Sequence, residues 1–232
     1  MKFPIRLVES GPAGGAILAS RIAAECGLDE VVSYDMGGTT AKLCLIDKAQ
    51  PLASRTFEVD RVYRFMKGSG LPIRIPVIEM VEIGAGGGSI AHVDTMKRIT
   101  VGPESAGSVP GPACYGRGGT QPTVTDADVV MGRIDPDVFA GGSVSLAPEA
   151  SKAAMAAEIG AKLNLSDALA AFGIAEVVDE NMANAARVHA IEWGKDIARR
   201  AMIAFGGAAP LHAARLAEKL EIDRIIIPTG AG

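Results

Sequence analysis

Residues 31–47, VVSYDMGGTTAKLCLID, place a polar, glycine-rich centre between two apolar runs. The first run predicts a buried strand, and the second alternates, with Leu43 and Leu45 on one face, as a strand does. A Walker loop or a Rossmann fingerprint needs a helix after its glycines, whereas a strand follows these. The stretch therefore predicts a β-hairpin.

The turn of this hairpin carries the chemistry of an anion site. Gly37 and Gly38 are able to take positive φ and to aim successive N–H groups at an anion, while Thr39 and Thr40 add hydroxyl donors. Asp35 ends the strand beside the same space, where a carboxylate would hold a metal cation or activate a water. A purely structural hairpin turn is an equally weighted alternative.

Composition favours an α/β protein. The chain has 232 residues, 48% hydrophobic and 4% aromatic, with 28 glycines, which predicts a core of Val, Ile, Leu and Ala with many tight turns. The net charge is −4 and no basic block occurs, so nucleic acid is not an expected partner.

Cysteine usage and hydropathy indicate a cytoplasmic protein. Cys26, Cys44 and Cys114 lie far apart without histidines at ligand spacing, which fits a reducing compartment and not a zinc site. No apolar stretch reaches the roughly 20 residues that span a bilayer, so no membrane association is expected. The chain starts without a leading element and stops one strand into a βα pattern, which predicts a fragment of a longer polypeptide.

A second glycine cluster lies within a Gly/Pro-rich region, residues 83–122. Gly86 and Gly87 precede an alternating, strand-like run, so the cluster is either a loop near a ligand or a structural turn. Cys114, in the 103–119 loop, is a candidate nucleophile, but no histidine lies nearby in the sequence to act as its base. Asp126 stands at a helix start, where it either caps the helix or contacts a metal or water, and it is the second candidate catalytic residue beside Asp35.

Helical patterns occupy residues 145–195 and both ends of the chain. Pro148 opens one helix and Ser166 caps another, while residues 9–28 predict a helix with Ile17, Ile22, Ala23 and Cys26 on one face. The C-terminal residues 200–228 predict a βαβ crossover. Its Gly206-Gly207 turn lies at a strand's carboxyl end, where open α/β sheets bind ligands, and His212 follows in the first helical turn.

Six ordered motifs resemble those of the hydantoinase A / 5-oxoprolinase family and span essentially the whole chain. They are SGPAGGAILASRIAAECGL, SYDMGGTT, EIGAGGGSIA, VGPESAGSVPGPACYGRGG, PTVTDADVVMGRIDP and AFGGAAPLHA. The resemblance implies a ribonuclease-H-like α/β lobe of the actin, Hsp70 and acetate-kinase ATPase superfamily. One domain, residues 1–232, would carry the glycine-rich loop and the helical segment as insertions.

The resemblance also implies site roles. Asp35, Gly37, Gly38 and Thr39 would form the second phosphate motif for ATP and Mg²⁺, and Gly206-Gly207 the adenosine turn. The first phosphate motif of the family is missing here, which supports the fragment interpretation and predicts that the 232 residues alone lack ATPase activity. A hydantoinase B-like subunit or domain is the implied partner.

The implied function is ATP-dependent opening of a cyclic amide, of the hydantoin or 5-oxoproline type, by phosphorylation of the amide oxygen. Lys42, Val81 and Ala209 replace frequent family residues and lean toward the ATP-dependent ketone carboxylases. An acetone-type carboxylase subunit is therefore the first alternative. A nucleotide-responsive assembly module without chemistry is the second.

Overall fold

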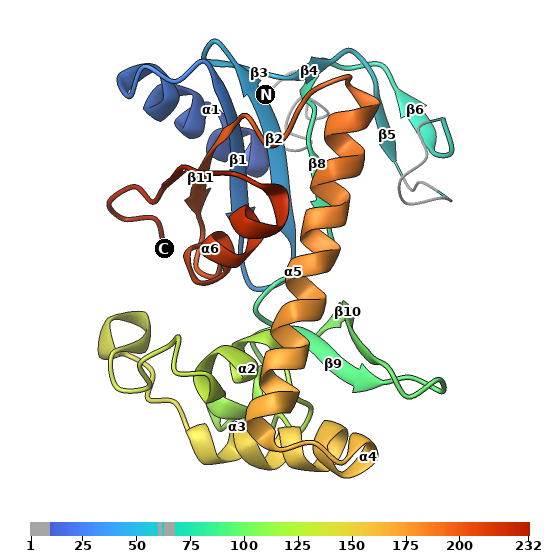
Figure 1. Cartoon of the computed structure of the whole chain (residues 1–232), viewed down its shortest axis with the longest axis vertical. Helices are drawn as coiled ribbons and strands as arrows, with labels where there is room; N and C mark the ends of the chain where they lie inside the picture. The colour runs from blue at the N-terminus through green and yellow to red at the C-terminus, as the bar shows by residue number, and fades with distance from the viewer. Residues whose placement is uncertain (1–9, 60–61, 63–67) are drawn as a thin grey trace, which may run out of the picture.

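A mixed sheet forms the centre of the molecule in the computed structural model, which describes residues 10–59, 62 and 68–232 (Figure 1). The strand order is β12-β11-β1-β2-β3, and β8 also pairs with β2. β12, β11 and β1 are parallel, whereas β2 runs antiparallel to β1, β3 and β8. The bounds are β1 (Glu30–Met36), β2 (Ala41–Asp47), β3 (Gln50–Pro51), β8 (Val81–Ile83), β11 (Ala201–Phe205) and β12 (Ile225–Ile226).

The predicted hairpin is present as β1 and β2. Seven residues of each strand pair in antiparallel register, with Asp35 opposite Lys42. Alternation divides the side chains between two hydrophobic clusters: Leu43 and Leu45 belong to one, and Cys44 and Ile46 to the other. The hairpin is therefore buried on both faces.

Helix α1 (Ser10–Glu25) covers one face of the sheet, and only part of the predicted face points inward. Ile17 is 59% exposed and Cys26 is exposed, while Ala16, Ala19 and Ala23 are buried against the sheet. Ile22 and Ala23 of the predicted face pack against the sheet as expected, whereas Ile17 and Cys26 do not. Small side chains let the helix approach the strands closely, so the alanine stripe is the centre of the inner face.

The opposite face packs against α5 (Asp167–Glu192) and α6 (Ala209–Leu220). Helix α6 connects β11 to β12, which confirms the βαβ crossover. Helix α5 begins at the predicted Ser166 cap, whose side chain accepts a hydrogen bond from Leu169 N. It runs from the sheet into a lower part of the molecule, so one helix joins the two parts (Figure 1).

The lower part holds the glycine-rich segment and the shorter helices. Pro148 opens a helix as predicted, and a π turn continues it. The helical bounds are η2 (Ala113–Tyr115), α2 (Val124–Val130), η3 (Phe139–Gly142), α3 (Pro148–Met155), η4 (Ala156–Gly160) and α4 (Ala161–Leu163). Three small two-stranded sheets complete the fold, namely β4 (Ala53–Ser54) with β7 (Val77–Ile78), β5 (Phe57–Val59) with β6 (Leu71–Ile73), and β9 (Ser89–Val93) with β10 (Ile99–Ser105).

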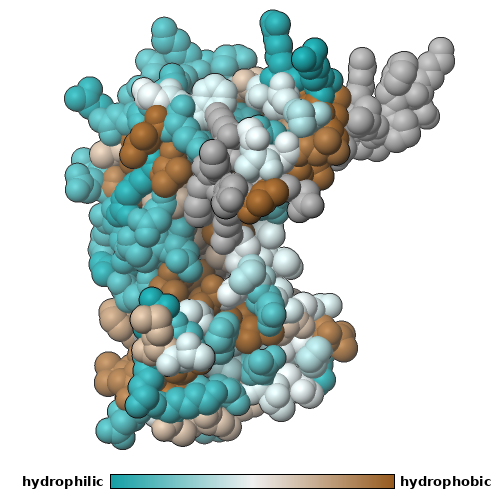
Figure 2. Space-filling view, turned by 90° about the vertical axis from the view of Figure 1, so that its right-hand side faces the viewer, coloured by the Kyte–Doolittle hydropathy of each residue, from teal (hydrophilic) through white to brown (hydrophobic). Residues whose placement is uncertain are grey.

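The surface is hollowed between the sheet part and the lower part on the face seen in Figure 2, and apolar residues are visible in the hollow. No helix within the described residues is both long and apolar enough to cross a lipid bilayer.

Candidate nucleotide site

Three glycine segments that lie far apart in the sequence meet at the tip of the β1–β2 hairpin. Gly87 N donates to Gly37 O over 3.0 Å, and Gly88 N donates to Gly38 O over 2.7 Å. From the other side, Ala208 N donates to Met36 O over 2.9 Å. The hairpin turn, the 86–88 loop and the 206–208 turn are thus joined by backbone hydrogen bonds.

Close backbone approach explains two of these glycines. A Cβ atom on Gly86 would lie 2.5 Å from Thr39 N, and one on Gly206 would lie 2.6 Å from both Asp35 Oδ1 and Met36 O. Gly206 also has a φ of +97°, which side chains rarely allow. For the 86–88 loop, the sequence allowed two interpretations, a loop near a ligand or a structural turn. In the structure this loop packs directly on the hairpin turn.

The hairpin turn has backbone N–H groups that the described residues leave unpaired, but its backbone conformation differs from the predicted one. Neither Gly37 nor Gly38 has a positive φ, so that expectation is wrong. The backbone N–H groups of Gly38, Thr39 and Thr40 nevertheless donate no hydrogen bond to any residue that the structure describes. These three residues line a pocket of about 360 Å³ together with Asp35 and with Gly11, which lies in the first turn of α1.

Asp35 lies in this pocket with its carboxylate unpaired by the described residues. Its side chain is half-buried, and burial raises its pKa above the usual value, while the charge of Lys42 lowers it. Lys42 donates to Thr40 Oγ1 over 2.7 Å and pairs with Glu82 over 2.9 Å. The carboxylate is therefore available to a ligand on the pocket side.

A magnesium ion would find a suitable but incomplete donor set here. Among the described residues no group of three or more His, Cys, Asp or Glu side chains could hold a metal. Mg²⁺ usually binds through one or two carboxylates, phosphate oxygens and water, so one carboxylate beside unpaired N–H groups fits a phosphate-bound ion. Asp35 is the candidate ligand.

A second pocket, of about 430 Å³, lies on the other side of the same turn. Gly38 and Thr39 line it together with Gly88 and with residues of the long loop, Gly107, Ser108, Pro112 and Tyr115. Thr125, at the start of α2, also lines it and donates through Oγ1 to Gly87 O over 2.8 Å. The sequence did not single out Thr125 for this contact.

Asp126 is fully buried and serves the backbone. It forms a capping box with Thr123, and its carboxylate also accepts from Ala113 N at 3.0 Å and Cys114 N at 2.8 Å. Ser151 Oγ donates to it over 2.6 Å. The capping alternative is confirmed, and this arrangement gives Asp126 no access to a substrate, contrary to its assignment as a catalytic residue.

Cys114 is also fully buried, in the 3₁₀ turn that Asp126 holds. Burial and then the Asp126 charge raise the pKa of its thiol to about 12, so it stays protonated at neutral pH. A thiol is nucleophilic only as the thiolate. The environment of Cys114 thus excludes the nucleophile interpretation.

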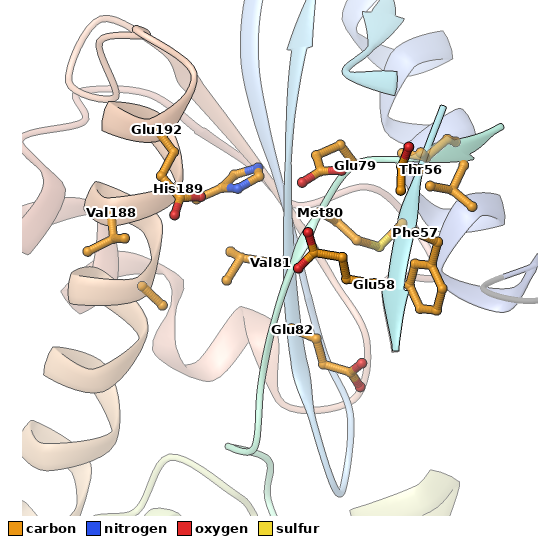
Figure 3. A pocket seen from close by; sticks show the side chains of 13 residues that line it. Thr56, Phe57, Glu58, Glu79, Met80, Val81, Glu82, Val188, His189 and Glu192 are labelled. Carbon is orange, nitrogen blue, oxygen red and sulfur yellow. The ribbon is translucent and has the colours of Figure 1, made fainter. Parts of the chain in front are cut away.

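A separate acidic pocket of about 180 Å³ lies between β8, the small strands and α5 (Figure 3). Glu58 and Glu79 face His189 and Glu192 across it, and Glu82 lines the same pocket. The negative charge of its glutamates disfavours phosphate, whereas the hairpin pocket offers N–H donors. Glu82 connects the two, because it lines this pocket and pairs with Lys42 of the other.

Comparisons with known proteins find relatives that match along nearly the whole chain. The family model described as hydantoinase/oxoprolinase matches residues 1–232. An uncharacterized protein of Methanocaldococcus jannaschii is 40% identical over 99% of this chain, and the caprolactamase α subunit of Pseudomonas jessenii is 38% identical over 97%. A nucleotide-free acetone carboxylase structure superposes with a TM-score of 0.85 at 30% identity, over 96% of this chain. The chain spans 34%, 31% and 30% of these relatives respectively.

Proposed function

The chain belongs to the hydantoinase/oxoprolinase family, and on that basis we propose that it supplies the phosphate-binding side of the nucleotide site in an ATP-dependent enzyme that opens a cyclic amide. The observation that carries the proposal is the row of N–H groups at Gly38, Thr39 and Thr40 that the described part of the chain leaves unpaired, in residues that share a pocket with the first turn of α1. Consecutive free N–H groups and a helix N-terminus both favour an anion.

Asp35 would hold Mg²⁺ on the phosphates, and the ion would neutralise charge during phosphoryl transfer. The Gly206-Gly207 turn would contact the adenosine, and Gly86 and Gly87 would support the phosphate turn from behind. A sheet of three antiparallel strands continued by two parallel ones, in the order β3-β2-β1-β11-β12, supports assignment to the actin-like ATPase superfamily as a ribonuclease-H-like lobe.

The proposed substrate is a hydantoin or 5-oxoproline type of ring. The γ-phosphoryl group would pass to the amide oxygen with release of ADP, which makes the ring carbon electrophilic. Water would then add to that carbon, the ring C–N bond would break, and phosphate would leave. The caprolactamase relative supports this class, since caprolactam is a cyclic amide and the solved enzyme is described as ATP-dependent, with a TM-score of 0.82 at 37% identity.

An ATP-dependent ketone carboxylase subunit is the second candidate. The superposition on acetone carboxylase favours it, as do Lys42, Val81 and Ala209. In that reaction the phosphorylated groups would be an enolate and bicarbonate. A partner subunit is proposed for either reaction, because the caprolactamase relative is named as an α subunit. Three free cysteines support a cytoplasmic location.

Turnover of ATP by the full-length protein with its partner tests the proposal. We expect ADP release to be stimulated by hydantoin, 5-oxoproline or a lactam and not by acetone with bicarbonate. Stimulation by the ketone and bicarbonate alone would select the second candidate. MgATP binding without turnover on either substrate class would instead indicate an assembly module, and absence of MgATP binding would refute the nucleotide site.

A further inference from the structure

A buried charged cluster lies behind the glycine segments. His212 in α6 contacts Asp179 Oδ1 through Nδ1 over 2.7 Å and Asp128 Oδ2 through Nε2 over 3.1 Å. The three side chains are no more than 1% exposed, so none of them reaches a ligand. We propose that this cluster fixes the position of the 206–208 turn relative to the 86–88 loop. Its functional purpose depends on the nucleotide site proposed above.

The cluster is linked to the 86–88 loop through α2. Asp128 is in the second turn of this seven-residue helix, three residues after Thr125. Thr125 holds Gly87 O with both its N–H, at 2.7 Å, and its hydroxyl, at 2.8 Å. A shift of α2 at Asp128 therefore moves the loop that packs on the hairpin turn.

His212 is linked to the 206–208 turn through the start of α6. His212 lies in the first turns of α6, which begins at Ala209 directly after that turn. Ala208 N is bonded to Met36 O, next to Asp35 and Gly37. The imidazole therefore bridges the helix that carries one glycine segment and the helix that holds another.

Charge balance explains why the bridge is built from ionisable groups. Burial lowers the pKa of His212, but its hydrogen bonds to Asp128 and Asp179 outweigh burial and raise the pKa to about 9. Arg133 also donates to Asp128 Oδ1 over 3.2 Å, so two cations face two carboxylates. Tyr34 of β1 faces both carboxylates, and burial, with their charges, raises its pKa.

Hydrogen bonds fix the orientation of the His212 side chain, which an apolar contact at the same place would not do. Two fixed acceptors on α2 and α5 allow the imidazole a single orientation, whereas apolar side chains would tolerate sliding of α6. Removing one member leaves an uncompensated buried charge, so the cluster is either intact or lost. The three helices are thereby held in one arrangement around the site.

Amide exchange in the ligand-free full-length protein tests this coupling directly. The reporters are Gly87, Gly88 and Ala208, whose N–H groups bridge the segments. In His212→Gln we expect these amides to exchange at least about tenfold faster than in the unmodified protein. Leu220→Ala, at the buried far end of α6, is the control, because it destabilises the helix without touching the cluster.

Kinetics provide the second measurement. His212→Gln should raise the KM for MgATP at least about fivefold with a smaller change in kcat, and Leu220→Ala should change neither. Should His212→Gln fail to fold, Asp179→Asn keeps the size of the side chain and the oxygen at Nδ1, and about threefold faster exchange of the same amides is expected.

Exchange in the His212 and Asp179 variants that matches Leu220→Ala at equal loss of stability would overturn the proposal. If the unmodified protein does not bind MgATP, the proposed function fails, yet the exchange rates still decide whether the cluster couples the segments. The two failures are therefore distinguishable.

Discussion

Asp35 and Asp126 occupy opposite situations in the same protein. The Asp35 carboxylate accepts no hydrogen bond from the residues that the structure describes and borders an open pocket. The Asp126 carboxylate is fully buried and accepts from Thr123, Ala113, Cys114 and Ser151. An aspartate whose oxygens are all bonded to its own chain holds structure, while one left unpaired beside free N–H groups is available for a ligand.

The largest expected effect is on the structural side of this comparison. Asp126→Ala leaves five buried donors without their acceptor. Each unsatisfied donor costs about 1 to 3 kcal/mol, so we expect a loss of about 5 kcal/mol or more in the free energy of unfolding. Urea titration followed by circular dichroism measures it. The matched variant Asp35→Ala should change this free energy by less than about 1 kcal/mol, and equal losses would erase the distinction between the two sites.

The His212 cluster should make the free energy of unfolding depend on pH. Its folded pKa of about 9 lies above the ordinary value of 6.5. The stabilisation is thus complete below about pH 6.5 and lost as pH rises through about 9, in total on the order of 3 kcal/mol. Urea titrations from pH 6 to 10 check this. A slope that persists unchanged in His212→Gln would assign the pH dependence to another group.

Asp35→Asn sharpens the functional side. Removing one electrostatic element from a transition state typically costs about a hundredfold in rate, which corresponds to about 2.7 kcal/mol. We expect that loss in ATP-dependent turnover of the full-length protein, with stability unchanged. Near-normal turnover in this variant, together with a loss in a folded Asp126→Asn, would reverse the two assignments.

Substitutions of glycine should have the smallest effects on stability. They distinguish a glycine required by close packing, Gly206, from a glycine that lines the pocket, Gly38. Gly206→Ala should destabilise by about 1 to 2 kcal/mol, since its positive φ disfavours a side chain and the methyl would meet Asp35. Gly38→Ala should change stability by less than about 1 kcal/mol, because nothing lies within 4 Å of the added atom. Thermal unfolding compares them, and a larger loss for Gly38→Ala would contradict the backbone geometry described above.

Local patterns predicted much of this fold. The hairpin, the βαβ crossover and the helix starts at Pro148 and Ser166 follow from alternation and capping chemistry, which act within a few residues. The inner face of α1 was predicted only in part, at Ile22 and Ala23, because pattern reasoning ranks Ile17 above Ala16 for burial. Close packing of that helix on the sheet instead requires the alanines.

The site depends on contacts that no local pattern encodes. His212 meets partners 33 and 84 residues away in the sequence, and Thr125 meets a carbonyl 38 residues away. The glycines around residues 37, 87 and 206 were each recognisable, but their convergence through backbone hydrogen bonds is a property of the packed helices α2 and α6. Asp126 carries the same side chain as Asp35, so only its surroundings distinguish the two.

Amide exchange of the full-length protein with and without MgATP tests the central claim most directly. If the hairpin turn binds phosphate, the amides of Gly38, Thr39 and Thr40 gain acceptors, and their exchange should slow by about tenfold or more. Unchanged exchange at these three amides, with protection instead at Glu79–Glu82 of the acidic pocket, would contradict the account.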